Sequence, residues 1–379
     1  MNNPSRKKRV VVFVAGLGSG GAERVAVRIC DWLHDTGHEV CLLTLSGTGT
    51  DFYSCPTEVL RLGLDLQHPS GSPVRAITAN LRRFWAVRRA VRSFSADVVL
   101  ALGDRSNILM LLATAGLRCR KIISERSDPE LEPLSPSWAL LRRLAYPMAS
   151  LHVSQSIRVS RWLSAKFPRL PSVVIGNTHG LKTLATGSSG LQSRLEGFSS
   201  FFELIAVGRL SREKGVDLLL HALSKIHATC SRPVRLTLVG DGEDRAALEL
   251  LTQRLGLSDQ VVFAGRVSNV EDWLRRSDVY LLPSRWEGFP NAMIEAMAAG
   301  LPVIAARCKG GVEDLLGDEL DRYALEFPPG DVYALVKCIE QLVNDASLRD
   351  RLAQSSLQRA AEYSPARIAA AWSAVVEAE

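Results

Sequence analysis

The segment Ser284-Arg285-Trp286-Glu287-Gly288-Phe289-Pro290-Asn291-Ala292-Met293-Ile294-Glu295-Ala296-Met297 contains two glutamates eight positions apart. Glu287 lies in a predicted loop with Gly and Pro, and Glu295 lies about two turns along the helix that follows. A helix that opens after such a loop presents unpaired amides and the positive end of its dipole, which suit a phosphate. The two carboxylates could then bind hydroxyls on either side of it, as a nucleotide-sugar requires. An ordinary helix start with surface acids is the alternative.

Short apolar runs alternate with helical patterns on both sides of this segment, which predicts βαβ units and parallel sheets. Strands are expected at 202–207, 235–239, 261–263, 279–282 and 302–305, and in the first half at 10–15, 40–45, 98–102, 121–124 and 151–154. Ser, Gly and Thr dominate between the halves. We therefore expect an α/β chain of two Rossmann-like, doubly wound domains whose carboxyl strand edges face a ligand cleft. The expected limits are 1–180, a linker at 181–200, a second domain at 201–362, and a final segment at 363–379.

Composition agrees with a globular protein of two domains. The chain has 379 residues, 46% of them hydrophobic and 23% charged, and no apolar run reaches the ~18 residues of a membrane span. Seven cysteines without paired spacing favour reduced thiols in a cytosolic protein. No Cys/His cluster has metal-ligand spacing, so no metal is expected.

Charge is distributed unevenly. Residues 1–185 hold 25 Lys and Arg against 13 Asp and Glu, whereas the remainder is acidic. Segment 74–94 is the extreme case, because it combines apolar residues at near-helical spacing with six arginines and no acid; these are Arg75, Arg82, Arg83, Arg88, Arg89 and Arg92. Such a helix can lie on anionic lipid or hold a diphosphate, and a solvated basic face is the alternative. Without a nucleic-acid motif, we favour an anionic membrane surface over nucleic acid.

The turn Val207-Gly208-Arg209-Leu210-Ser211-Arg212-Glu213-Lys214-Gly215 follows the first strand of the second half. Gly208 allows close backbone approach, and Arg209 and Lys214 are suited to a diphosphate. A solvated basic turn is the alternative.

Two further turns are expected at the same edge. Asp241, in Val239-Gly240-Asp241-Gly242-Glu243, could cap the next helix, although a structural turn is the favoured interpretation. Backbone groups near Arg266 and Val267, after the strand ending in Phe263-Ala264-Gly265, could contact a base.

The first half offers two loops for the same cleft. In Gly16-Leu17-Gly18-Ser19-Gly20-Gly21-Ala22-Glu23-Arg24 the pair Gly20-Gly21 would let amides approach a phosphate or sugar, although the match to a dinucleotide fingerprint is imperfect. In Ile123-Ser124-Glu125-Arg126-Ser127-Asp128-Pro129, Glu125 and Arg126 follow a strand and could meet the ligand. A salt bridge among Glu125, Arg126 and Asp128 is the alternative.

Together these motifs resemble family 4 glycosyltransferases with the GT-B fold, over nearly the whole chain. The resemblance rests on GGAERV at 20–25, GRLSREKG at 208–215, VGDG at 239–242, EGFPNAMIE at 287–295 and AMAAGLPVIA at 296–305. The loop at 124–129 lacks the histidine of many members and looks like a branch that includes transferases for amylovoran-type exopolysaccharide and N-acetylgalactosamine transferases acting on lipid-linked oligosaccharide. Asn177-Thr178 replaces the usual Asn-Pro at the domain junction. The final segment resembles the family's last helix, which crosses back to the N-terminal domain.

The resemblance implies a retaining, metal-independent hexosyltransferase that uses a nucleotide-sugar, with UDP as the expected carrier. Arg209 and Lys214 would bind the diphosphate, Glu295 the ribose hydroxyls and Glu287 the donor sugar. The expected contacts of the donor are completed by Gly20, Gly21, Gly208, Asp241, Arg266, Val267, Gly288, Phe289, Asn291 and Ala292. Glu125 and Arg126 are assigned to the catalytic site without individual roles.

The expected acceptor is a lipid-diphosphate-linked saccharide, used at the inner face of the cytoplasmic membrane by a cytoplasmic, peripheral enzyme. No cofactor is expected, since the nucleotide-sugar is a co-substrate. The alternatives are a UDP-sugar 2-epimerase, which would need acids placed to move a sugar proton, and a catalytically silent partner that binds nucleotide-sugar or lipid. The identities of base, sugar, acceptor and linkage, and the oligomeric state, stay open.

Overall fold

The structure of the protein is a computed structural model that describes residues 7–18, 20–67, 73–179, 200–226 and 230–378, with the backbone alone at 73–76. Nearly all of the predicted linker lies outside these residues. The chain divides into two compact units, one made of Met1–Asn177 with Ala366–Glu379 and the other of Thr178–Pro365. The domain limits expected from the sequence stay predictions.

In its described part, the first unit contains a seven-stranded parallel sheet with the order β3-β2-β1-β4-β5-β6-β7. The strands are β1 (Arg9–Val14), β2 (Glu39–Thr44), β3 (Leu60–Gly63), β4 (Val98–Leu102), β5 (Arg120–Glu125), β6 (Leu151–Ser154) and β7 (Ser172–Val174). The helices are α1 (Gly21–Asp35), α2 (Pro73–Phe94), α3 (Asp104–Ala113), α4 (Pro136–Ala145), α5 (Ile157–Lys166) and α14 (Pro365–Glu377). The interior strand β1 is apolar after Arg9 and buried there, as expected of a parallel strand covered on both faces.

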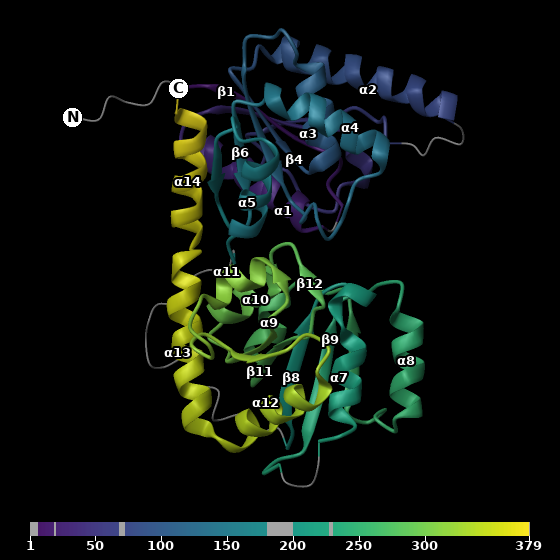
Figure 1. Ribbon diagram of the computed structural model, residues 1–379, viewed down its shortest axis with the longest axis vertical. Helices are drawn as coiled ribbons and strands as arrows, with labels where there is room; N and C mark the ends of the chain where they lie inside the picture. Colours follow the sequence, from purple (N-terminus) through teal and green to yellow (C-terminus); the bar gives the residue numbers. More distant parts are fainter. Residues whose placement is uncertain (1–6, 19, 68–72, 180–199, 227–229, 379) are drawn as a thin grey trace, which may run out of the picture. The chain divides into compact units, whose positions relative to one another are not determined.

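The second unit has a six-stranded parallel sheet in its described part, with the order β10-β9-β8-β11-β13-β15. Its strands are β8 (Phe202–Val207), β9 (Val234–Val239), β10 (Val261–Gly265), β11 (Val279–Leu282), β13 (Val303–Ala306) and β15 (Leu325–Phe327). A separate pair is formed by β12 (Trp286–Glu287) and β14 (Lys309–Gly310). The helices are α7 (Val216–Leu223), α8 (Arg245–Arg254), α9 (Val270–Arg275), α10 (Asn291–Ala298), α11 (Gly311–Leu316), α12 (Val332–Asn344) and α13 (Ala346–Glu362) (Figure 1).

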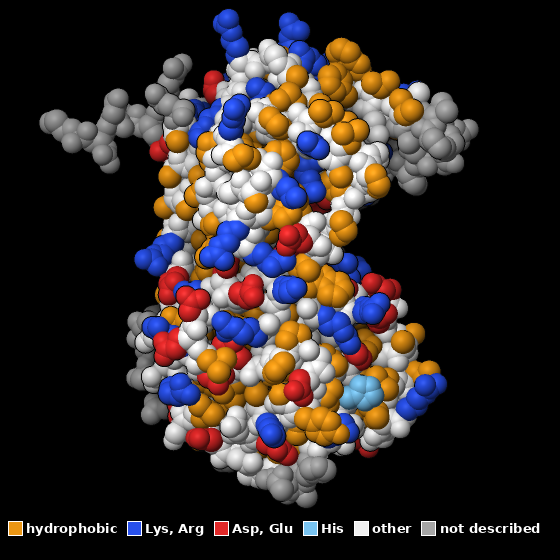
Figure 2. All heavy atoms as spheres, viewed as in Figure 1, with side chains coloured by type: hydrophobic (Ala, Val, Ile, Leu, Met, Phe, Trp, Pro, Cys, Tyr) orange, Lys and Arg blue, Asp and Glu red, His pale blue; other side chains and the backbone are white. Residues whose placement is uncertain are grey.

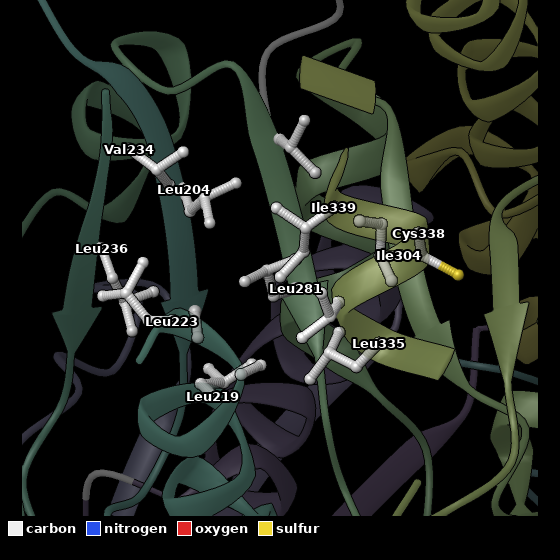
Figure 3. Close-up of a cluster of buried hydrophobic side chains, with 14 of the residues drawn as sticks. Leu204, Leu219, Leu223, Val234, Leu236, Leu281, Ile304, Leu335, Cys338 and Ile339 are labelled. Carbon is white, nitrogen blue, oxygen red and sulfur yellow. The ribbon is translucent and has the colours of Figure 1, made fainter. Parts of the chain in front are cut away.

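Alternate side chains of this second sheet enter two different cores, because successive residues of a strand face opposite ways. Leu204 and Leu281 lie in the core that includes α7 and α12, as Figure 3 shows. Ile205 and Leu282 lie in the core that includes α9, α10 and α11. Helices therefore cover both faces of the sheet, so ligands can reach its strands at the carboxyl edge.

The last helix, α14, belongs with the first unit from Ala366 onward. Its Trp372 is buried. Lys8 Nζ donates to the carbonyl oxygens of Val376 and Glu377, both at 2.9 Å, and Arg120 donates to that of Val375 at 2.6 Å. Cationic side chains thus satisfy carbonyls that the end of a helix leaves unpaired.

Within the described residues, no helix is both long enough and apolar enough to cross a bilayer. All seven cysteines are free thiols.

Candidate functional site

The two segments singled out in the second half meet at the carboxyl edge of its sheet. Lys214 ends the short 3₁₀ turn η4 (Arg212–Lys214) after β8, and its Nζ donates to both carboxylate oxygens of Glu287, at 2.6 and 2.8 Å. Ser284 Oγ donates to the same carboxylate at 2.7 Å. Glu287 is only 5% exposed, so its charge is held by a cation and a hydroxyl rather than by bulk water. Residues 73 positions apart thus form one charged cluster.

A pocket adjoins this cluster. Its lining includes Gly208, Arg209 and Lys214 from the first segment, and Tyr280, Pro283 and Ser284 from β11 and the loop that follows. The Arg209 side chain is exposed. The pocket has a volume of only about 20 Å³, room for about one water molecule, so an anionic group such as a phosphate would bind at its mouth, beside Arg209 and Lys214, and not inside it.

Tyr280 lines the pocket and was not predicted from the sequence. Its hydroxyl is buried, and it has no hydrogen-bond partner among the described residues. Burial raises the pKa of Tyr280, and the carboxylates of Glu287 and Glu295 raise it further. Tyr280 is one of the residues that line the pocket, and its surroundings include both glutamates of the 287–295 segment. A tyrosine inside the apolar run Val279–Leu282 was the available signal, because a buried hydroxyl normally has a partner.

Helix α10 begins at Asn291, which puts Glu295 in its second turn. Glu295 is buried, and the residues that open the helix, Asn291 and Ala292, are half-buried. The side chain of Phe289 is also buried and packs on Tyr363, with ring centroids 5.7 Å apart. Gly288 is half-buried, and the contact of the Gly288 and Phe289 amides with a ligand stays a prediction.

Two glycines allow backbone segments to pack directly on each other here. Gly240 has φ +133°, and a Cβ on it would lie 1.8 Å from the carbonyl oxygen of Gly208. Gly310, which pairs with Glu287, has φ +121°, and its Cβ would lie 1.7 Å from the Glu287 carbonyl oxygen. Since L side chains rarely adopt such φ values and backbone atoms cannot move aside, both positions require glycine. Gly310 lies outside the motifs that were singled out in the sequence.

Arg285 fastens the two segments together and was also missed as a positioning residue. Its guanidinium binds both carboxylate oxygens of Asp217, at 2.9 and 2.7 Å, and donates to the carbonyl oxygen of Arg212 at 2.7 Å. Its backbone amide donates to the carbonyl oxygen of Glu213 at 2.8 Å. Bidentate pairing of this kind fixes both position and angle.

The remaining predicted residues of this half lie along the strand ends. Asp241 accepts from the amide of Gly242 at 3.0 Å, which is a turn contact. The suggestion that Asp241 caps a helix is wrong, because the N-cap of α8 is Asp244. Arg266 is exposed and Val267 half-buried just after β10.

In the first unit, Gly20 is the N-cap of α1 and Gly21 its first residue. Glu125 ends β5 and is fully buried: it accepts from the hydroxyl of Tyr146, which in turn accepts from Asn107 Nδ2 at 3.3 Å. Burial raises the pKa of Glu125 to about 7, although the Tyr146 hydrogen bond opposes the shift. The side chain thus faces the helical layer of its own unit.

Arg126 points to a different set of groups. It donates to Asn177 Oδ1 and, at 3.4 Å, to Ser124 Oγ, and burial lowers the pKa of its guanidinium to about 10. Asp128 pairs instead with Arg158 at 2.7 Å. The suggested salt bridge from Arg126 to Asp128 is therefore wrong.

The basic helix α2 uses its arginines in two ways. Arg83 donates to the carbonyl of Leu66 at 3.0 Å, and Arg88 to those of Ala113 and Ala115, both at 2.8 Å. Arg82, Arg89 and Arg92 are exposed, and they form no ion pair with the described residues. The Arg75 side chain lies outside the described atoms.

A stripe of exposed apolar side chains accompanies these cations on α2: Ile77, Leu81 and Trp85, the last 63% exposed, recur every four residues. Figure 2 shows hydrophobic and basic side chains at the surface over α2. Exposed apolar groups beside arginines are typical of an interfacial helix.

The sequence matches two families, a glycosyl transferase 4-like domain over residues 20–178 and glycosyl transferases group 1 over residues 196–359. It is 28% identical to a Campylobacter jejuni α-1,4-N-acetyl-D-galactosaminyltransferase acting on a diNAcBac-PP-undecaprenol-linked GalNAc saccharide, over 96% of this chain and 97% of the relative. It is 24% identical to the amylovoran biosynthesis glycosyltransferase AmsD of Erwinia amylovora, over 97% and 99%. These matches confirm the resemblance drawn from the motifs.

Among solved structures, Anabaena Alr3699/HepE in complex with UDP and glucose superimposes with a TM-score of 0.78 at 20% identity, over 97% of this chain and 99% of that one. The two doubly wound units together with this likeness confirm the predicted GT-B fold.

Proposed function

Since the chain belongs to the glycosyltransferases that join a 4-like domain to a group 1 domain, we propose that it transfers a hexose or N-acetylhexosamine from a UDP-sugar to a lipid-linked saccharide. The product would enter a surface polysaccharide or glycan. The observation that carries the proposal is the cluster of Lys214, Glu287 and Ser284 beside the pocket that Gly208 and Arg209 line. The name of the Campylobacter relative supports a lipid-linked acceptor, and the name of the Erwinia relative supports polysaccharide biosynthesis.

In the proposed mechanism, the donor diphosphate takes the place of the Glu287 carboxylate as a partner of Lys214. Arg209 and Lys214 then offset the charge that grows on the leaving diphosphate, which is where fixed cations lower a barrier most. Glu287 accepts hydrogen bonds from the donor sugar and Glu295 from the ribose. The acceptor hydroxyl attacks the anomeric carbon on the face from which the diphosphate departs, and a diphosphate oxygen takes its proton. The configuration is retained, and no divalent metal is required.

The acceptor would be held at an anionic membrane surface by α2. Its apolar stripe would enter the interface while Arg82, Arg89 and Arg92 contact lipid phosphates or the acceptor diphosphate. The enzyme would then work as a peripheral protein on the inner face of the cytoplasmic membrane.

The proposal is tested with purified protein, a panel of UDP-, GDP- and ADP-sugars, and a synthetic polyprenyl-diphosphate saccharide. We expect one UDP-sugar to give transfer, undiminished by EDTA, and the anomeric coupling in the product NMR spectrum to match the donor. Product of inverted configuration would refute the mechanism, and loss of turnover in EDTA would refute metal independence.

The same assay separates the alternatives. A UDP-sugar 2-epimerase would change the donor without an acceptor, and a silent partner would bind the donor, as a raised melting temperature shows, without transfer or hydrolysis.

A further inference from the structure

A second cavity lies in the first unit, in a part of the fold that the proposed transfer does not use. It has a volume of about 450 Å³ and is lined by Ala139, Arg142 and Arg143 of α4 and by Trp162, Ala165, Lys166 and Phe167 of α5 and its end. Lys166 closes α5, and Arg142 and Arg143 lie in the last turn of α4. A volume of this order accommodates a small ligand or a lipid headgroup.

The charge around this cavity has one sign. Its lining holds three cations and no acid. Within the described residues, no ion pair neutralises Arg143 or Lys166, and both are exposed. Between residues 133 and 179 the sequence has no Asp or Glu, and its cations are Arg142, Arg143, Arg158, Arg161, Lys166 and Arg169. An anion entering the cavity would therefore meet no opposing carboxylate on its walls.

Arg142 is the most buried of the three cations. It is only 9% exposed, and its guanidinium stacks over the Trp162 ring at 4.7 Å. Among the described residues it forms an ion pair with Glu125, whose Oε1 lies 4.0 Å from the Arg142 Nη1, and its guanidinium donates no hydrogen bond there. A guanidinium carries five N–H donors, and because Arg142 lines the cavity these donors are available to a ligand there. Since burial raises the pKa of Glu125 to about 7, that carboxyl compensates the charge only in part near neutral pH.

The surroundings of the cations are apolar. Trp162 and Phe167 form part of the wall, and on α4 the neighbouring Leu140 and Leu144 are exposed, at 59% and 64%. A ligand that fits such a site has a compact anionic head and an apolar continuation. We propose that the cavity between α4 and α5 binds a phosphate group, carried either by an anionic lipid or by a soluble phosphate compound. Arg142 contacts that phosphate from below, and Arg143 and Lys166 contact it from the rim.

The test uses two double variants with equal changes of charge. Arg143→Glu/Lys166→Glu reverses the rim of the cavity, while Arg161→Glu/Arg169→Glu reverses two exposed cations of the same region that do not line it. Thermal melts and donor hydrolysis in solution, which should be unchanged in both, show that each variant is folded. Each protein is titrated with inorganic phosphate by calorimetry, and with vesicles of phosphatidylglycerol or phosphatidylcholine by co-sedimentation.

Cavity binding predicts that the rim variant loses at least about tenfold in affinity, whereas the control loses several-fold less, since each surface cation contributes modestly to attraction by an anionic membrane. A lipid source gives this difference with phosphatidylglycerol vesicles, and a soluble source gives it with phosphate alone. Equal losses in both double variants with both probes would overturn the proposal, because attraction would then follow net charge and not the cavity.

Discussion

Replacing Lys214 by alanine tests whether this side chain meets the donor diphosphate or merely holds Glu287 in place. The substitution removes both contacts to the Glu287 carboxylate, at 2.6 and 2.8 Å, and leaves Ser284 as the donor to it. Because Glu287 is buried while the Lys214 side chain is 28% exposed, we expect a loss of about 1–3 kcal/mol in the free energy of unfolding, less than for a fully buried pair.

The effect on turnover should be larger. Removing one fixed group that stabilises developing negative charge costs a factor of about 10²–10³ in kcat, or roughly 3–4 kcal/mol. Lys337→Ala is the matched control, since Lys337 is exposed on α12 and has no recorded partner among the described residues. It should change the free energy of unfolding by less than about 0.5 kcal/mol and turnover by less than about twofold.

A double-mutant cycle with Glu287→Ala separates the two roles of Lys214. If the lysine contacts the diphosphate, the double variant is slower than Glu287→Ala alone, and Lys214→Ala weakens the binding of UDP itself. Turnover is measured by UDP release and UDP binding by calorimetry, at a temperature well below both melting points. Unchanged UDP affinity in Lys214→Ala, with the double variant no slower than Glu287→Ala, would refute the diphosphate contact and leave a positioning role.

Three further predictions concern other groups. Burial raises the pKa of Glu125 from 4.5 to about 7, so between these values the folded protein holds a proton that the unfolded chain has released. The free energy of unfolding should therefore fall by up to about 3 kcal/mol as the pH rises from 4.5 past 7. In urea melts at pH 5 and pH 8, Glu125→Gln should show less of this fall than the original protein, and an identical fall would contradict the prediction. Tyr280→Phe removes a buried hydroxyl without a described partner and should raise the free energy of unfolding by about 1 kcal/mol, whereas a loss of stability would show that the hydroxyl is bonded. Gly310→Ala forces a Cβ toward the Glu287 carbonyl, so it should lower the free energy of unfolding by more than about 3 kcal/mol in a urea melt and lower turnover as well. Gly49→Ala is the control, because a Cβ at Gly49 meets no other atom within 4 Å.

Elements with a strong local pattern were predictable from the sequence. The strand at Val10–Val14 was predicted because a continuous apolar run indicates burial on both faces. The helix after Phe289 was predicted because its apolar residues recur at helical spacing. The strands β3 and β7 were missed, since they are short and only partly buried.

Site residues were predictable where a charged side chain follows the end of a strand. They were not predictable where their role depends on contacts with a distant part of the chain. Lys214 and Glu287 were found, but Gly310 acts through a partner strand that sequence spacing does not reveal. The direction of Glu125 could have been inferred, because it is two residues beyond the core residue Ile123 and therefore faces the same helical layer.

The contacts of α14 bear on the order in which the chain can fold during synthesis. The first unit consists of residues 1–177 and of the segment from Ala366 onward. In that segment, the last carbonyl oxygens of α14 accept hydrogen bonds from Lys8 and Arg120. Residues 178–365 leave the ribosome as one continuous stretch, so the second unit has all its parts while the first still lacks the helix that buries Trp372. A fragment ending at Asn177 would expose the surface that Trp372 covers, so separate expression of the first unit calls for α14 to be joined to it.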